Sequence, residues 1–379
     1  MGFGVNETTH TKKINFLVAN STIYFFPILL INYKGDLDLL GIFLILVEFG
    51  GVFVGTVLTI QGCLIIYKTR VFHSNMNRCL CSFLLHWFEF VIGKLMILPY
   101  QKGWILIPGN DPSKIFHEFY STSLPDMPIV RSFWESPSLI IGMFLITHYM
   151  IVAVMFVFGL TVERSCATYL INDYECKKRH GIPRTIMLFI ETTSFVLAFS
   201  TCKRIIAIEV GLFLVVFGIL AAFMGFLYIW YQNVRVHHIL DTSLVIPSKY
   251  TLQARFQAKE NIKSLNFTKF IVIFVVVCII LEVIFLICQI SELLGSYEIA
   301  ILYFIELGNT SNAVVTVPII VISVPSWRRR FFEQYAFVPG VRRFILRKPK
   351  VVNVKTRVRT KSQQQETEQY FDQFKKAWG

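Results

Sequence analysis

The chain has 379 residues, of which 54% are hydrophobic and only 16% are charged, and its formal net charge is +13. Soluble domains carry roughly a quarter charged residues, and their apolar residues do not come in runs of about twenty. Here apolar blocks separated by short polar segments follow one another along the whole chain. The composition therefore excludes a series of soluble domains and indicates an integral membrane protein.

Seven apolar blocks are long enough to cross roughly 30 Å of hydrocarbon as helices, the conformation that satisfies backbone polar groups in lipid. We place them at residues 39–67, 79–98, 138–161, 185–201, 205–230, 270–290 and 299–324. The expected fold is an all-α bundle of seven transmembrane helices at 39–324, with an amino-terminal segment at 1–38 and a basic tail at 325–379. The join between the fourth and fifth spans, near Cys202, is so short that the two can be misread as one interrupted span.

Residues 14–33 form a further apolar stretch, which is long enough to suggest an eighth span. Polar residues such as Asn15, Asn20 and Asn32, together with Pro27, weaken its insertion into lipid. We interpret this stretch as an apolar lid or interfacial segment outside the membrane, and the eight-span alternative stays open.

The distribution of basic residues predicts the orientation, because Lys and Arg concentrate in cytoplasmic loops. The loops after the first, third and fifth spans and the tail hold 28 Lys and Arg, whereas the amino terminus and the other three loops hold 8. The amino terminus is therefore expected outside the cell and the tail in the cytoplasm. Two Asn-x-Ser/Thr glycosylation acceptors, Asn6 and Asn20, fall on the expected outer side.

The tail begins with aromatic residues at helical spacing behind Pro325, with Arg328 to Arg330 between them. This pattern predicts a short amphipathic helix on the inner membrane surface, where basic residues face anionic lipid. We prefer this interpretation to nucleic-acid binding. Beyond Val351 the tail is polar, and we expect it to be disordered.

The spans offer little from which to build a catalytic or metal centre. His86 and His148 are single residues in separate spans, and within the spans no His-x-x-x-His or Glu-x-x-His spacing occurs. We therefore expect no enzyme, no cofactor and no metal site. Cys202 and Cys288 lie near the expected outer face, and the sequence leaves open whether they form a disulfide.

Charged residues inside spans are costly and point by default to function. Glu282 and Glu306 are placed to face a central cavity, and Glu89 and Lys94 lie five residues apart in the second span, poor spacing for a direct pair. The residues of this kind are Glu48, Glu89, Lys94, Glu191, Glu209, Glu282 and Glu306. They keep a multi-pass transporter or channel open as the alternative function.

Small residues indicate where helices approach closely. Gly51 and Gly55 form a Gly-x-x-x-Gly motif in the first span, and Gly211, Gly218 and Gly225 recur every seven residues in the fifth. We expect both stripes to pack against neighbouring helices.

The residues Glu163-Arg164 stand at the expected cytoplasmic end of the third span, in the string VERSCATYLINDYECKKR. An acidic–Arg pair there resembles the signature of G-protein-coupled receptors. This string, the string RFQAKENIKSLNFTK before the sixth span, and the string FHSN after the first span are similar to those of the nematode serpentine chemoreceptors of class epsilon, the Sre family. The resemblance covers residues 38–334. Three elements of the rhodopsin-like pattern are absent: Asn-Pro-x-x-Tyr in the seventh span, Asp in the second span, and Cys at the outer end of the third.

The resemblance implies a chemosensory receptor in the plasma membrane of chemosensory neurons or their cilia, which binds a small molecule and activates a heterotrimeric G protein. We expect the ligand between the outer halves of the third, fifth, sixth and seventh spans, under the loop at 100–136 and the segment near Pro27. The candidate pocket residues are His148, Glu209, Glu282 and Glu306.

The coupling switch is expected at Glu163, Arg164 and Glu260. Residues 252–266 should extend the sixth span as a helix, with Leu252, Phe256 and Ile262 facing the bundle and Glu260 as the resting partner of Arg164. Outward movement of the sixth span would then separate the pair.

Overall fold

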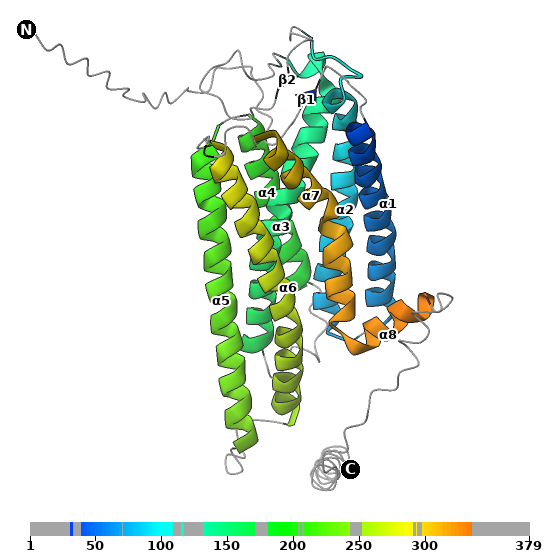
Figure 1. Ribbon diagram of the computed structural model, residues 1–379. Helices are drawn as coiled ribbons and strands as arrows, with labels where there is room; N and C mark the ends of the chain where they lie inside the picture. Colours follow the sequence, from blue (N-terminus) through cyan, green and yellow to red (C-terminus); the bar gives the residue numbers. More distant parts are fainter. Residues whose placement is uncertain are drawn as a thin grey trace, which may run out of the picture.

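The computed structural model of the protein describes residues 31–32, 39–69, 71–108, 115–116, 130, 132–170, 181–203, 205–206, 208–242, 252–290, 293 and 298–335. Its long elements are helices that run side by side as a bundle (Figure 1). They are α1 (Leu39–Lys68), α2 (Ser74–Gln101), α3 (Pro137–Tyr169), α4 (Gly181–Cys202), α5 (Ile208–Thr242), α6 (Leu252–Ile290) and α7 (Glu298–Ile322).

All seven helices contain segments that are long and apolar enough to cross a membrane, so the seven-span prediction is confirmed. Helix α4 ends at Cys202 and α5 begins at Ile208, so the short join separates two helices. Helix α6 begins at Leu252, so its predicted extension beyond the apolar block is also present.

Two short strands accompany the helices. Strand β1 (Ile31–Asn32) pairs antiparallel with β2 (Ile115–Phe116), and Ile31 lies opposite Phe116. The pair lies at the end of the bundle where α3 begins (Figure 1), and the short helix η2 (Phe133–Glu135) precedes α3 in the chain. The end of the 14–33 stretch is thus extended and attached to the loop between α2 and α3. The rest of that stretch lies outside the described residues, so its role as a lid stays a prediction.

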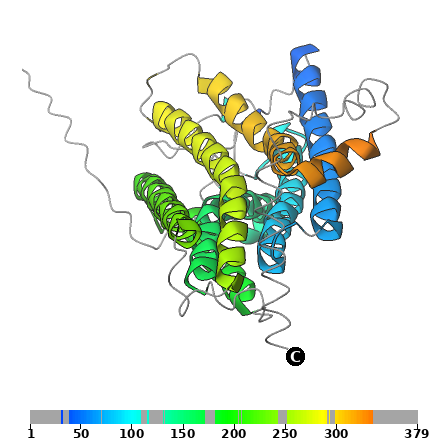
Figure 2. The same cartoon turned by 90° about the horizontal axis from the view of Figure 1, so that it is seen from below.

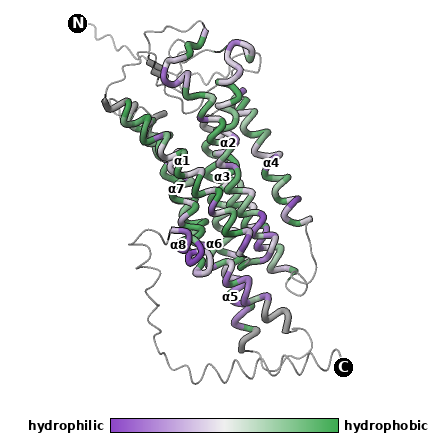
Figure 3. The backbone as a smooth tube through the Cα atoms, turned by 90° about the vertical axis from the view of Figure 1, so that its right-hand side faces the viewer, coloured by the Kyte–Doolittle hydropathy of each residue, from purple (hydrophilic) through white to green (hydrophobic). Residues whose placement is uncertain are grey.

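Helix α3 is the central element of the bundle. It packs against α2, α4, α5 and α6, whereas α1 packs against α2 and α7 (Figure 2). The contact between α2 and α3 includes Phe83 and Phe156, whose rings stack with centroids 3.9 Å apart. The outward faces are apolar, as lipid requires; Phe53 of α1 is 71% exposed. Figure 3 shows hydrophobic colour along the spans and hydrophilic colour on α8.

Helix α8 (Pro325–Gln334) crosses beneath α1 and α7 at the opposite end of the bundle from β1 and β2 (Figure 1). Trp327 anchors it: the indole is fully buried, and its Nε1–H donates to the carbonyl oxygen of Thr69 at 2.8 Å. The Trp327 ring also meets Phe72 and Phe267 edge-on, and these two rings stack at 4.9 Å. The short helix expected behind Pro325 is therefore present and docked by aromatic packing.

The two predicted glycine stripes differ in whether they pack against a neighbouring helix. A Cβ on Gly51 would lie 3.2 Å from Thr310, and one on Gly55 would lie 2.7 Å from Trp87, so the motif in α1 does allow close approach. In α5 a Cβ on Gly211 or Gly218 would meet no described atom within 4 Å. The expectation that the α5 stripe packs against a neighbour is therefore wrong for these two residues, because this face of α5 turns away from the bundle.

Helices α2 and α3 approach closely at Gly93 and Gly142, a pair of glycines that the sequence did not single out. A Cβ on Gly142 would lie 2.6 Å from the Cγ2 of Ile97 and 2.8 Å from the carbonyl oxygen of Gly93. Because one of these contacts is backbone, rotation of a side chain cannot relieve it.

We expect Gly142→Ala to lower the free energy of unfolding by roughly 1–3 kcal/mol, the usual effect of overpacking. The measurement is the midpoint of thermal unfolding of the purified protein in detergent. Gly218→Ala is the matched control, since its Cβ enters open space among the described residues. Equal midpoints for Gly142→Ala and the unmodified protein would contradict the close crossing.

Candidate functional site

Glu163 and Arg164 form a buried ion pair near the end of α3. The Arg164 Nη2 and Nε lie 2.6 Å and 2.5 Å from the two carboxylate oxygens of Glu163, so the guanidinium holds the carboxylate with two hydrogen bonds. Arg164 is 4% exposed and Glu163 is 0% exposed. Such charge-assisted, two-point contacts are strong, and burial makes either partner costly to remove.

The same guanidinium ties α3 to α6. Arg164 Nη1 donates to the hydroxyl of Ser264, and Asn261 Nδ2 donates to the backbone carbonyl of Ala167 at 3.2 Å. On the other side, Asn233 of α5 donates to the hydroxyl of Thr168 at 2.7 Å. This end of the bundle therefore holds together through hydrogen bonds that link α3 to both α5 and α6.

The expected pairing of Glu260 with Arg164 is wrong. Glu260 lies one turn away from Lys263, which approaches it at 3.3 Å, while Arg164 binds Glu163 and Ser264. Helix α6 turns its neutral polar residues inward, with Asn261 and Ser264 each 2% exposed, so Glu260 points to the side. The facing residues also differ from the prediction: Ile262 is only half-buried, and the side chains of Leu252 and Phe256 lie outside the described residues.

The predicted pocket residues do not gather in one place. Glu306 of α7 joins Lys94 of α2, whereas His148 of α3 faces Glu89. Glu282 of α6 is half-buried and close enough to Tyr149 to act on it electrostatically. The Tyr149 hydroxyl in turn accepts a hydrogen bond from Asn312 of α7 at 2.9 Å.

Other predicted features lie outside the described residues or differ in detail. The side chain of Glu209 and the acceptors Asn6 and Asn20 lie outside the described residues. Cys202 and Cys288 are both free thiols, and Cys202 lies 3.9 Å from the hydroxyl of Thr147.

Lys94 is the centre of a buried charge cluster between α1, α2 and α7. Its ammonium lies 2.5 Å from Glu48 and 3.5 Å from Glu306, and it donates to Gln101 at 2.9 Å. The Gln101 amide also donates to Glu306. A small hollow beside it is lined by Glu48, Lys94 and apolar side chains of α1 and α2. As the spacing predicted, Lys94 and Glu89 have different partners.

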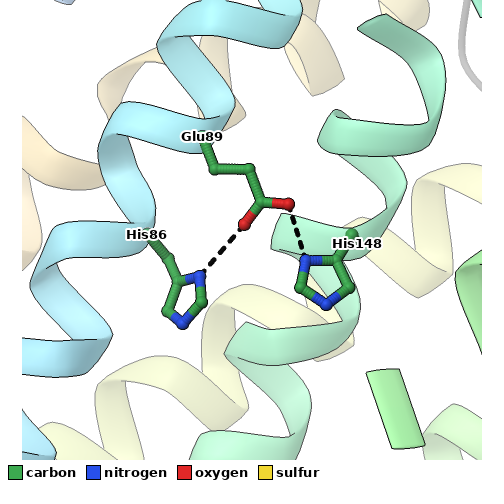
Figure 4. Close-up of side chains that lie close together, drawn as sticks. All are labelled: His86, Glu89 and His148. Atoms are coloured by element: carbon green, nitrogen blue, oxygen red, sulfur yellow. Dashed lines mark hydrogen bonds and ion pairs between the residues drawn. The ribbon is translucent and has the colours of Figure 1, made fainter. Parts of the chain in front are cut away.

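A third polar cluster, between α2, α3 and α4, was not predicted from the sequence. His86 and Glu89 of α2 lie 3.0 Å apart, and His148 of α3 approaches Glu89 at 2.6 Å (Figure 4). Glu191 of α4 lies 2.8 Å from His86. Ligand atoms of His86, Glu89 and His148 all lie within 4.8 Å of one another, close enough to hold a metal ion. The signal available was His86-x-x-Glu89, which puts both side chains on one helix face.

This architecture defines a seven-helix membrane receptor of the serpentine type, with an acidic–Arg pair at one end of its third helix and a short helix after the seventh. The profile of the family described as Sre G protein-coupled chemoreceptor matches residues 14–379, and the chain belongs to this family.

Three relatives from Caenorhabditis elegans show the same relationship. Serpentine receptor class epsilon-37 is 28% identical over 323 residues, which are 84% of this chain and 86% of the relative. Class epsilon-38 is 28% identical over 378 residues, 96% of this chain and 100% of the relative. Class epsilon-45 is 27% identical over 372 residues, which are 96% of this chain and 99% of the relative. The predicted resemblance is therefore confirmed over nearly the whole chain.

Removing Lys94 should strongly destabilise the bundle, because it leaves the Glu48 and Glu306 carboxylates buried without their cation. We expect Lys94→Met to cost roughly 3–5 kcal/mol, the usual effect of breaking a buried ion pair from one side. The midpoint of thermal unfolding in detergent measures it. The triple variant Lys94→Met, Glu48→Gln, Glu306→Gln should recover most of the loss, and Lys259→Met, on the exposed face of α6, is the control. A triple variant no more stable than Lys94→Met would contradict the charge argument.

Proposed function

We propose that this protein is a chemosensory receptor of the plasma membrane, in chemosensory neurons or their cilia, that binds a small molecule and activates a heterotrimeric G protein. Family membership supports a chemoreceptor role rather than an enzymatic one. The observation that carries G-protein coupling is the buried Glu163–Arg164 pair, which is hydrogen-bonded to Ser264 of α6.

The proposed orientation has the amino terminus outside and the basic tail in the cytoplasm. The imbalance of Lys and Arg between the two sets of loops supports it. The end of the bundle that holds α8 and the Glu163–Arg164 pair is then the cytoplasmic end. Within this division, residues 1–38 form the outer segment, 39–324 the membrane domain and 325–379 the inner tail.

The proposed switch is separation of α6 from α3. In the described state, Arg164 donates a hydrogen bond to Ser264 of α6, and Asn261 of α6 donates one to the carbonyl of Ala167 in α3. Outward movement of α6 breaks both bonds, and the Arg164 guanidinium becomes available to the G protein. An agonist favours this state only if it binds it more tightly than the closed state. Glu260, partly exposed on the same stretch of α6, pairs with Lys263 and lies outside this switch.

The agonist contact proposed here is Glu282 with Tyr149 and Asn312, which connect α3 to α7 beside it. Glu306 and His148, held in the Lys94 and Glu89 clusters, are left out of this pocket. The attachment of β1 to the loop between α2 and α3 supports a cap over this end of the bundle.

The coupling proposal predicts that basal activity depends on Ser264 and not on Glu260. We expect Ser264→Ala to raise agonist-free nucleotide exchange on a Gα subunit several-fold, because a hydrogen bond to a charged group, worth roughly 1.5–3 kcal/mol, is lost from the closed state. Glu260→Lys should leave basal exchange unchanged, and Arg164→Ala should abolish it. The assay uses the purified receptor and a panel of Gα subunits in vesicles.

Basal exchange that responds to Glu260→Lys but not to Ser264→Ala would overturn this switch. Solute flux or ion current through the same vesicles, without nucleotide exchange, would favour the transporter or channel alternative instead.

The orientation predicts glycosylation at the amino terminus. We expect treatment of the expressed protein with an N-glycosidase to increase its gel mobility, and Asn6→Gln with Asn20→Gln to abolish that shift. Asn266→Gln is the control, since its Asn-x-Thr motif lies on the proposed cytoplasmic side. A shift that persists in the double variant and disappears in Asn266→Gln would reverse the orientation.

A further inference from the structure

Four side chains form a closed ring between α2, α3 and α4, within the spanning parts of these helices. The two oxygens of Glu89 face the Nδ1 atoms of His86 and His148, at 3.0 Å and 2.6 Å (Figure 4). The two oxygens of Glu191 face the Nε2 atoms of the same histidines, at 2.8 Å and 3.8 Å. Every imidazole nitrogen therefore faces a carboxylate oxygen.

Two neutral imidazoles cannot satisfy this ring on their own. A neutral imidazole has one N–H donor and one lone pair, so two of them supply two hydrogens for three nitrogen–oxygen contacts of hydrogen-bond length. The remaining contact, at one nitrogen of His86, would set a nitrogen lone pair against a carboxylate. A cation on one side of the ring removes the conflict, because it accepts two nitrogen lone pairs while the other two nitrogens donate.

The net charge of the ring also favours a bound cation. Two carboxylates beside neutral imidazoles carry a charge of −2, which is costly inside a bilayer. His86, Glu89 and His148 are 13%, 17% and 9% exposed at their side chains, so water offers them little compensation. One divalent cation makes the whole cluster neutral.

We propose that His86, Glu89 and His148 bind a divalent transition-metal ion of the zinc type, and that Glu191 orients the two imidazoles. The ion sits between the Glu89 carboxylate and the two Nδ1 atoms. Both Nε2–H groups then donate to Glu191. Carboxylates that accept the second ring N–H of metal-bound histidines are a general feature of such sites.

The donor set and its spacing fit this class of ion. Imidazole nitrogen and carboxylate oxygen are standard zinc ligands, at about 2.0–2.2 Å from the metal, which sets tetrahedral ligand atoms about 3.3 Å apart. The Nδ1–oxygen distances of 3.0 Å and 2.6 Å need to open by less than about 1 Å. Three protein ligands leave a fourth position for water or for a donor atom of another molecule.

The site assigns a function to groups that the G-protein switch does not use, since the ring lies on α2, α3 and α4 and the switch on α3 and α6. It does not depend on the proposed receptor activity. Metal binding can therefore be tested on the purified full-length protein without a Gα subunit or an agonist.

The test is equilibrium dialysis of chelator-treated receptor in detergent against ZnCl2, with metal content measured by mass spectrometry, and parallel titration with CoCl2 followed by visible absorption. We expect one Zn²⁺ per chain at micromolar free metal, cobalt bands of a tetrahedral nitrogen–oxygen site, and a higher midpoint of thermal unfolding with zinc. Glu89→Gln keeps the size of the side chain but removes the anionic ligand, so it should lose stoichiometric binding. Glu191→Gln should keep one site with a roughly 10- to 100-fold higher Kd.

His237→Ala with His238→Ala is the matched control, because this pair in α5 is the most obvious competing place for adventitious zinc. It should leave one Zn²⁺ per chain. Metal lost in this control and retained in Glu89→Gln would overturn the proposal. A second result would also overturn it: the unmodified protein binds no stoichiometric Zn²⁺, and low pH stabilises the unmodified protein but not Glu89→Gln. That outcome would show that two protons neutralise the ring. If Glu89→Gln fails to fold, the cobalt spectrum of the unmodified protein and the Kd of Glu191→Gln still decide between these outcomes.

Discussion

The absence of water in the hydrocarbon layer is the constraint on which the rest of this structure depends. A polar group that faces lipid has no partner there, so each ionisable side chain in a span must find one within the bundle. Lys94, Arg164 and His148 each do so, and each has partners on another helix. The apolar helices alone would tolerate many relative rotations, whereas these pairs specify which faces meet.

Helix α3 connects two of these clusters, because His148 lies on it toward α2 and α4 and Arg164 lies near its other end toward α6. The two attachments differ in kind. Around His148 the partners on α2 and α4 carry charge, whereas Arg164 donates to the neutral hydroxyl of Ser264 on α6. Arg164 has a charged partner, Glu163, on its own helix, so breaking the Arg164–Ser264 bond does not separate this buried ion pair. That distinction supports the proposed outward movement of α6.

The sequence predicted the number and length of the helices well, because a run of apolar residues directly reflects the thickness of hydrocarbon. It predicted contacts between helices poorly, because hydropathy says little about how a helix is rotated. Glu260 was assigned to Arg164 by proximity and charge, yet one helical turn brings Ser264 there instead. Gly211 and Gly218 matched a packing motif but face away from the bundle. His86 and Glu89 gave a local signal, but its completion by His148 and Glu191 required the packing of three helices.

The polar contacts differ in kind between two parts of the bundle. Helices α1, α2 and α7 share the Lys94 cluster, and α8 fastens their ends through Trp327 to Thr69 and Tyr335 to Gln61. Helices α5 and α6 are joined to α3 near this end by neutral hydrogen bonds from Asn233 and Asn261. Such bonds contribute roughly 0.5–1.5 kcal/mol each, and water or a partner protein can replace them. A group of helices joined by buried charges and a second group joined by neutral contacts fit the proposed switch, which requires an element with two possible arrangements.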